Sequence, residues 1–86
     1  MVNRLYILLD IVDGKADKAT EIVRKNPGVV ITDTLEGPPD VVIVMEAPKR
    51  RQLAKLAMQV LASVESLTEN VCLLPSQGEQ GSHAST

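Results

Sequence analysis

The hydrophobic and polar positions of this 86-residue chain change their period several times, and each period predicts one element. Residues 4–12 and 41–47 are apolar almost throughout, which is typical of strands buried on both faces. Residues 29–35 and 67–74 alternate between apolar and polar side chains, which predicts half-buried strands, the first of them at a sheet edge. In residues 29–35 the apolar side chains expected on one face are Val29, Ile31 and Leu35.

Two further segments have a helical period. The apolar positions of residues 15–25 and 49–64 recur every three or four residues, which predicts two amphipathic helices. Asp13 is a candidate N-cap of the first helix. The sequence Asn26-Pro27-Gly28 is expected to end that helix, because Pro cannot continue it and Gly turns the chain.

Prolines mark the remaining boundaries of the predicted elements. Residues 36–40 carry two prolines and are expected to form a loop between the two middle strands. Pro75 is expected to end the last strand, which gives one domain over residues 1–75. Residues 76–86 contain no aliphatic side chain larger than Ala, and a disordered tail is expected there.

The predicted order of elements is β-α-β-β-α-β, which is the ferredoxin-like α+β fold. It has a four-stranded antiparallel sheet with two helices on one face. Right-handed crossovers place residues 4–12 and 41–47 in the middle of the sheet. These are also the two segments that are apolar on both faces, so two independent signals agree on the fold.

Two helices can cover only one face of such a sheet, and the other face would expose a large apolar patch. A homodimer that packs through this face is the simplest way to cover it. Asp10 interrupts the first strand and needs a partner if it lies on this face, such as the Tyr6 hydroxyl or Arg4 of a second copy. The expected dimer interface consists of Tyr6, Leu8, Asp10, Val12, Val42 and Val44.

Composition argues against a nucleic-acid-binding face. The formal net charge is −2, whereas broad nucleic-acid binding needs a basic surface. Tyr6 is the only aromatic residue, so the sheet lacks the stacking platforms of RNA-recognition domains. Lys49-Arg50-Arg51 is a local basic cluster, for which a solvated face is favoured over a phosphate site.

Catalytic and metal-binding motifs are not recognised in the sequence. Cys72 is the only cysteine, so neither a disulfide nor a Cys-x-x-Cys metal motif can form within the chain. The only histidine, His83, lies in the predicted tail, away from any Cys-His or Ser-His-acid arrangement. We therefore expect no catalytic residues, metal or cofactor. Without a signal sequence or a membrane-spanning run, the expected location is cytoplasmic.

Four segments in order resemble the ligand-binding (RAM) domain of the AsnC/Lrp family of transcription regulators. They are the opening strand YILLDIVDGK, the helix end RKNPGVV, the loop and strand EGPPDVVIVMEA, and the closing strand ENVCLLP. The resemblance covers about residues 4–75. Its most specific parts are Asn26-Pro27-Gly28-Val29 and the spacing Gly37-x-x-Asp40-Val41. Family members typically carry an N-terminal DNA-binding helix-turn-helix domain, so a stand-alone form without direct DNA binding is expected.

The resemblance also implies a function. Such domains dimerise through the sheet, often assemble further, and bind small effectors, usually amino acids, near the loop that joins the second and third strands. Carried over, this points to Gly37 and Asp40 as ligand-binding residues. The residues themselves leave another reading open, because Asp40 can accept backbone N–H bonds and Gly37 can serve a turn. Family members often carry a non-proline residue where this chain has Pro38 and Pro39.

Three hypotheses of function follow. The first is a non-catalytic regulatory or sensor module that forms homo-oligomers and binds an amino acid or another small molecule between subunits. The second is a structural protein whose oligomer docks a partner or a full-length regulator without a small ligand. The third, a small dimeric α/β-barrel enzyme, is the least favoured, because the predicted core has no His and almost no aromatic side chains.

Overall fold

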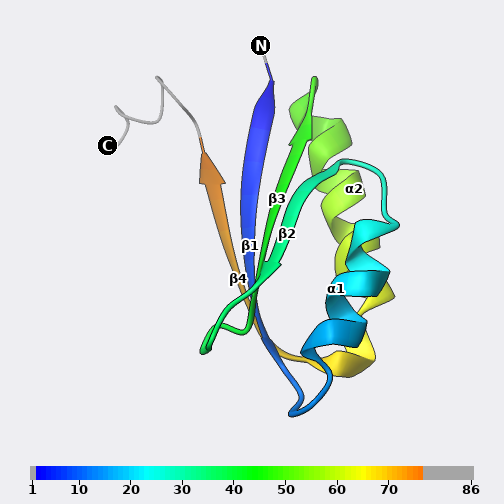
Figure 1. Ribbon diagram of the computed structural model, residues 1–86. Coiled ribbons are helices and arrows are strands. Elements are labelled where there is room, and N and C mark those ends of the chain that lie inside the picture. The colour runs from blue at the N-terminus through cyan, green and yellow to red at the C-terminus, as the bar shows by residue number, and fades with distance from the viewer. Residues whose placement is uncertain (1, 77–86) are drawn as a thin grey trace.

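The computed structural model describes residues 2–76, and its elements follow the predicted order (Figure 1). The strands are β1 (Asn3–Ile11), β2 (Val29–Thr34), β3 (Val41–Ala47) and β4 (Thr68–Ser76). The helices are α1 (Ala16–Arg24) and α2 (Arg50–Ser63), and a short 3-10 helix (Glu65–Leu67) leads into β4. The predicted ferredoxin-like α+β fold is confirmed.

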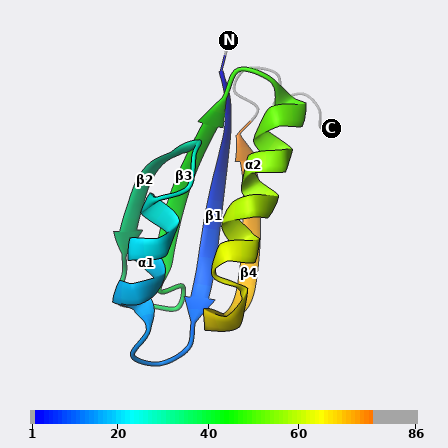
Figure 2. The same ribbon diagram turned by 90° about the vertical axis from the view of Figure 1, so that its right-hand side faces the viewer.

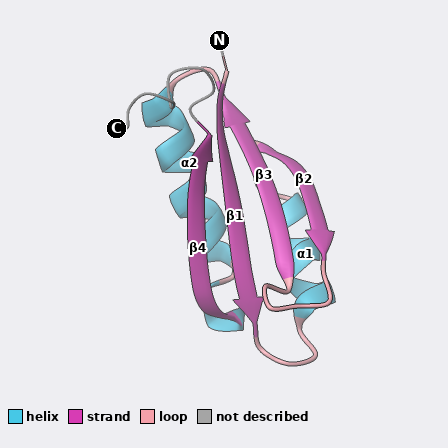
Figure 3. Ribbon diagram, turned by 90° about the vertical axis from the view of Figure 1, so that its left-hand side faces the viewer, coloured by secondary structure: helices cyan, strands magenta, loops and turns pink. Residues whose placement is uncertain are grey.

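The four strands form one antiparallel sheet in the order β2-β3-β1-β4 (Figure 3). The two strands that are apolar on both faces, β1 and β3, are central, as predicted. They pair in a continuous register in which Tyr6 lies opposite Val44 and Leu8 opposite Val42. Alternate residues of both strands therefore point to the same face of the sheet.

Both helices lie on one face of the sheet, and within residues 2–76 no helix covers the other (Figures 1 and 2). The core lies between the helices and the sheet, and the largest side chains that are wholly buried there come from the two central strands. These are Ile7, Leu9, Ile43 and Met45. The apolar face of α2 supplies Leu53, Ala57 and Val60 to the same core, and the C-cap residue Val64 joins them. An aliphatic core of this kind holds the central strands in register.

One face assignment from the sequence is wrong, and a β-bulge is the reason. The register between β2 and β3 shifts between Val29 and Ile31. Val29 pairs with Met45 on the helix side, whereas Ile31 pairs with Val44 on the open side and is 48% exposed. An extra residue in one strand moves every later side chain to the other face. The bulge thus adds an apolar residue to the open face.

Asp13 does not cap α1. The N–H of Lys15 donates to the carbonyl of Val12 at 3.0 Å, and Gly14 takes a positive φ of 80° within this turn. The helix therefore begins at Ala16 with Lys15 as its N-cap, and no side chain bonds to the cap.

The last strand is longer than predicted. Pro75 does not end it, because β4 continues to Ser76 and pairs Pro75 with Leu5. A proline is tolerated here since β4 is an edge strand, where a missing N–H need not interrupt a ladder. Ser76 thus belongs to the sheet rather than to the predicted tail, and residues 77–86 of that tail lie outside the described residues.

Candidate functional site

The open face of the sheet is turned toward the viewer in Figure 3. The strand registers place its side chains side by side in rows across the strands. One row is apolar and crosses all four strands: Ile31, Val44, Tyr6 and Leu74. The next row is Asp33, Val42, Leu8 and Cys72. Of the six residues predicted to form a dimer interface, Val12 follows the end of β1 and the other five lie on this face. All six are half-buried in the single chain.

Polar side chains border these rows at both ends. At one end Arg4 pairs with Glu46, with Arg4 Nη2 2.7 Å and Nε 2.8 Å from Glu46 Oε2. The hydrogen bond to Glu46 raises the pKa of Arg4, and the Tyr6 hydroxyl adds to this effect. At the other end the Asn70 amide donates to Asp10 Oδ2 at 3.3 Å. Asp10 therefore has a partner within its own chain, and a bond from a second copy stays a prediction.

A hollow of about 280 Å³ lies on the open face at its Asp10 end. The sheet supplies side chains of β1 and β4, and the loop between β2 and β3 supplies a wall of two prolines. The lining residues are Leu8, Asp10, Pro38, Pro39, Asn70, Val71 and Cys72. In Figure 1 this loop extends to the side of the sheet away from the helices. The hollow thus combines one carboxylate and one amide with apolar walls.

The loop that forms the proline wall is held to the sheet by Asp40. The backbone N–H of Asp40 donates to the carbonyl of Leu9, and the carbonyl of Asp40 accepts from the N–H of Leu35, both at 2.8 Å. Its side-chain Oδ2 accepts the N–H of Ile11, also at 2.8 Å. A charged acceptor makes this last bond stronger than a neutral one. Asp40 therefore fixes the loop against the end of β1.

Gly37 allows the Asp40 carboxylate to take this position. A Cβ placed on Gly37 would collide with Asp40 Oδ1. Of the loop residues, Pro38 and Pro39 line the hollow, whereas Gly37 and Asp40 do not. The structural reading of Gly37 and Asp40 thus has direct contacts to support it, while their contact with a ligand stays a prediction.

The sequence placed Asp10 in the interface but missed that it shares a hollow with Asn70 and Cys72. The alternation of β4 indicated that Asn70 and Cys72 share a face. Their position beside β1 depends on the register of two strands about 60 residues apart, in which Leu8 pairs with Cys72 and Asp10 with Asn70. No short-range pattern in the sequence reports such a register.

The chemistry available in the hollow is that of binding. A lone carboxylate among apolar side chains can receive an ammonium group, and the prolines and Leu8 can contact an aliphatic chain. Cys72 is an exposed free thiol.

Within residues 2–76, no three His, Cys, Asp or Glu side chains are grouped so as to hold a metal ion. In the same range, no helix is long and apolar enough to cross a membrane.

The same fold occurs in several solved structures, although no family model and no curated protein matches this chain. A hypothetical protein of Pyrococcus horikoshii superposes with a TM-score of 0.78 at 18% identity, over 96% of this chain and 98% of that one. A transcriptional regulator of Neisseria meningitidis, solved as a complex with L-Met, gives a TM-score of 0.69 at 18% identity. That match covers 90% of this chain and 51% of the regulator.

A third structure widens the range of proteins with this fold. A NIPSNAP family protein of Agrobacterium tumefaciens superposes with a TM-score of 0.63 at 10% identity, over 88% of this chain and 91% of that one. At such identities the likeness shows a shared fold. That fold is found in the Neisseria transcriptional regulator, where the match covers about half of the chain, and in small proteins of its own size.

Proposed function

We propose that this protein is a non-catalytic regulatory module that dimerises through the open face and binds a small amino compound, such as an amino acid, in the hollow beside Asp10. One observation carries the proposal. Apolar side chains cross all four strands of a sheet face that no helix covers, and a carboxylate lies at their edge. Apolar patches of this kind mark interaction sites on soluble proteins.

Dimerisation would complete the hollow. The hollow is open to solvent in the single chain, because its walls come only from the sheet and from Pro38 and Pro39. A second sheet packed on the open face would cover Leu8 and enclose the carboxylate of Asp10. The attraction between this carboxylate and a ligand's ammonium group grows when water is excluded. Ligand binding and association would therefore support each other.

The neighbouring structures support the proposal at the level of function class. A regulator with this fold has been solved with L-Met. The resemblance of residues 4–75 to the AsnC/Lrp ligand-binding domain agrees with a regulatory role in which a small molecule acts on an oligomer. In this chain Asp10, Pro38 and Pro39 would form the ligand site.

Thermal unfolding in the presence of each of the twenty amino acids tests the ligand. We expect one or more of them to raise the unfolding temperature in a concentration-dependent way, because a ligand that binds only the folded state stabilises it. The substitution Asp10→Asn keeps the shape of the side chain and removes its charge, so it should abolish the rise. Asp33→Asn is the matched control, since Asp33 lies on the same face but does not line the hollow.

Two results would count against the ligand. One is the absence of a rise with any amino acid, and the other is an equal rise in the Asp10 and Asp33 variants. Neither result bears on dimerisation, which is tested separately by measuring the mass of the protein in solution.

A further inference from the structure

The charges are unevenly divided between the α2 segment and the rest of the chain. Residues 49–64 hold four of the nine Lys and Arg residues and none of the eleven Asp and Glu residues. The rest of the chain therefore has five cations against eleven carboxylates. The surface of α2 is cationic on a protein whose formal net charge is −2.

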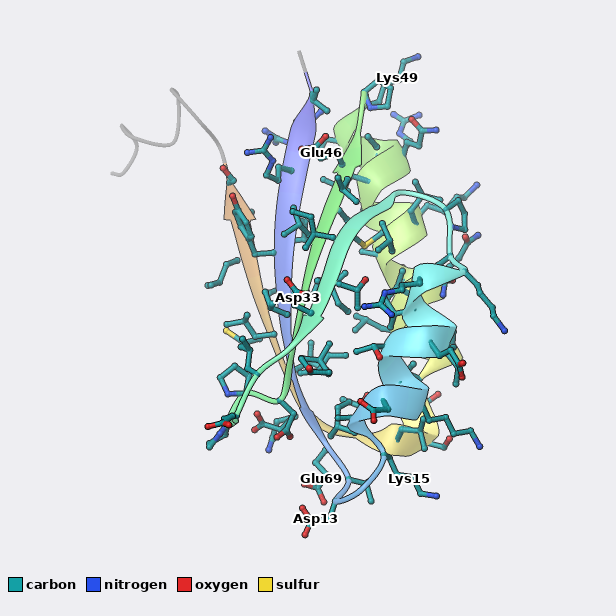
Figure 4. The ribbon with its side chains drawn as sticks, viewed as in Figure 1. Asp13, Lys15, Asp33, Glu46, Lys49 and Glu69 are labelled. Carbon is teal, nitrogen blue, oxygen red and sulfur yellow. The ribbon has the colours of Figure 1, made fainter. Side chains whose placement is uncertain are left out.

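Three of these cations line a hollow of about 790 Å³ at the beginning of α2. Arg51 and Lys55 are four residues apart and so lie on the same side of the helix. Lys49 precedes the helix in an extended conformation. The other lining residues are Gln52 and Leu56. Figure 4 shows Lys49 at one end of the molecule, with Asp13 and Glu69 at the other.

The three cations are exposed, and their charges are not neutralised by the described part of the chain. No carboxylate of residues 2–76 forms an ion pair with Lys49, Arg51 or Lys55. The first turn of α2 contains no acidic residue, and no side chain bonds to its N-cap. Like charges one helical turn apart repel, and cations at this end of a helix oppose its dipole. An anion in the hollow would relieve both effects.

Leu56, which lines the hollow, is held in place by the turn between α1 and β2. A Cβ on Gly28 would lie 2.8 Å from Leu56 Cδ1, so the turn packs closely on this side chain. The Asn26 amide also donates to Ser63 Oγ of α2 at 3.1 Å. The cations are therefore presented by a helix that is fixed to its neighbour, which lowers the ordering cost of binding.

We propose that this hollow binds a small molecule that carries two or more phosphate groups. Arg51 can bind a phosphate through two parallel N–H bonds, while Lys49 and Lys55 act as point charges. The volume lies within the range of small-molecule sites. Duplex nucleic acid fits less well, because a protein that binds it neutralises about six to ten phosphates, and the remaining surface is acidic. The site lies in the helix layer, so it stays accessible when the open face is covered.

Calorimetric titration with inorganic tripolyphosphate at low ionic strength tests the site. We expect saturable binding to the full chain, and a loss of affinity of about tenfold or more in Arg51→Gln and in Lys55→Gln. The matched control is Lys18→Gln, which changes the net charge equally but lies on the exposed surface of α1. Its affinity should stay within about twofold of wild type. Circular dichroism checks that each variant is folded.

Three results would overturn the proposal. The first is no binding of tripolyphosphate by the wild-type protein. The second is an equal loss of affinity in the Arg51, Lys55 and Lys18 variants, which would indicate attraction by net charge alone. The third is binding of a DNA duplex without binding of tripolyphosphate, which would make the surface a nucleic-acid site. None of these results depends on the open face, so they leave the proposed regulatory function untouched.

Discussion

The two faces of the sheet are built from the same two central strands but have different surroundings. On the covered face, Ile7, Leu9 and Ile43 are wholly buried beneath the helices. On the open face their neighbours Tyr6, Leu8 and Val44 are apolar too, yet only half-buried. A single chain therefore has a closed hydrophobic core on one face of the sheet only. The covered face should determine the stability of the single chain, and the open face its association.

The largest expected effect comes from the covered face. Ile43→Ala leaves a cavity among wholly buried side chains, so it should lower the free energy of unfolding by about 2 to 5 kcal/mol. Urea unfolding at a fixed protein concentration measures this. Met58→Ala is the control, because Met58 is 71% exposed on α2, and it should change stability by no more than about 0.5 kcal/mol. Similar losses in the free energy of unfolding for the two variants would show that Ile43 is no more important to stability than an exposed side chain.

A substitution on the open face should weaken the association of two chains rather than the folding of one chain. Val44→Lys places a charge in the middle of the apolar row, where a second copy would have to bury it. The wild-type unfolding temperature should rise with protein concentration, as expected when folding and association are coupled, and this dependence should disappear in the variant. Met58→Lys, on the helix side, should keep it. A concentration dependence that survives in Val44→Lys would show that association uses another surface.

The loop beside the open face should show an intermediate effect. Gly37→Ala forces the Asp40 carboxylate from its place and so weakens its bond to the Ile11 N–H. Loss of a charge-assisted bond of this kind should cost about 1 to 3 kcal/mol in urea unfolding. The adjacent Glu36→Ala, at an exposed position, serves as the reference. If both substitutions were equally mild, Asp40 would not anchor the loop.

The smallest effect is expected at the margin of the open face. Arg4 and Glu46 form an ion pair whose side chains are 47% and 27% exposed. Solvent screens such a pair, so Glu46→Gln should leave the unfolding midpoint unchanged within error, at low salt and at high salt alike. A clear loss of stability at low salt that disappears at high salt would show that the pair contributes more than its exposure suggests.

The sequence predicted the fold because its signals are local and agree with one another. The helical and strand periods, the turn at Asn26-Pro27-Gly28 and the loop with two prolines each determine one element. The two strands that are apolar on both faces then determine the centre of the sheet. Alternation along β1 and β3 likewise assigns side chains to faces, so Tyr6, Leu8, Asp10, Val42 and Val44 could be placed together on one face; the dimer interface itself stays a prediction.

The parts that were missed depend on register. The bulge in β2 moved Ile31 to the open face, and the pairing of β1 with β4 places Asn70 beside Asp10. Neither the bulge nor this pairing has a signature in a short stretch of sequence. The basic hollow on α2 was visible as a cluster, Lys49-Arg50-Arg51, but Lys55 and Leu56 join it only once the helix is formed. The extension of β4 through Pro75 likewise depends on its place at the sheet edge.

The mass of the wild-type protein in solution is the most direct test of association through the open face. Light scattering after size-exclusion chromatography, at about 10 µM where a standard interface would be occupied, measures it without any substitution. A dimer or larger assembly gives at least twice the chain mass of 9.3 kDa, which is the result that we expect. A single species at the mass of one chain would contradict it, because the apolar rows of the open face would then remain in water.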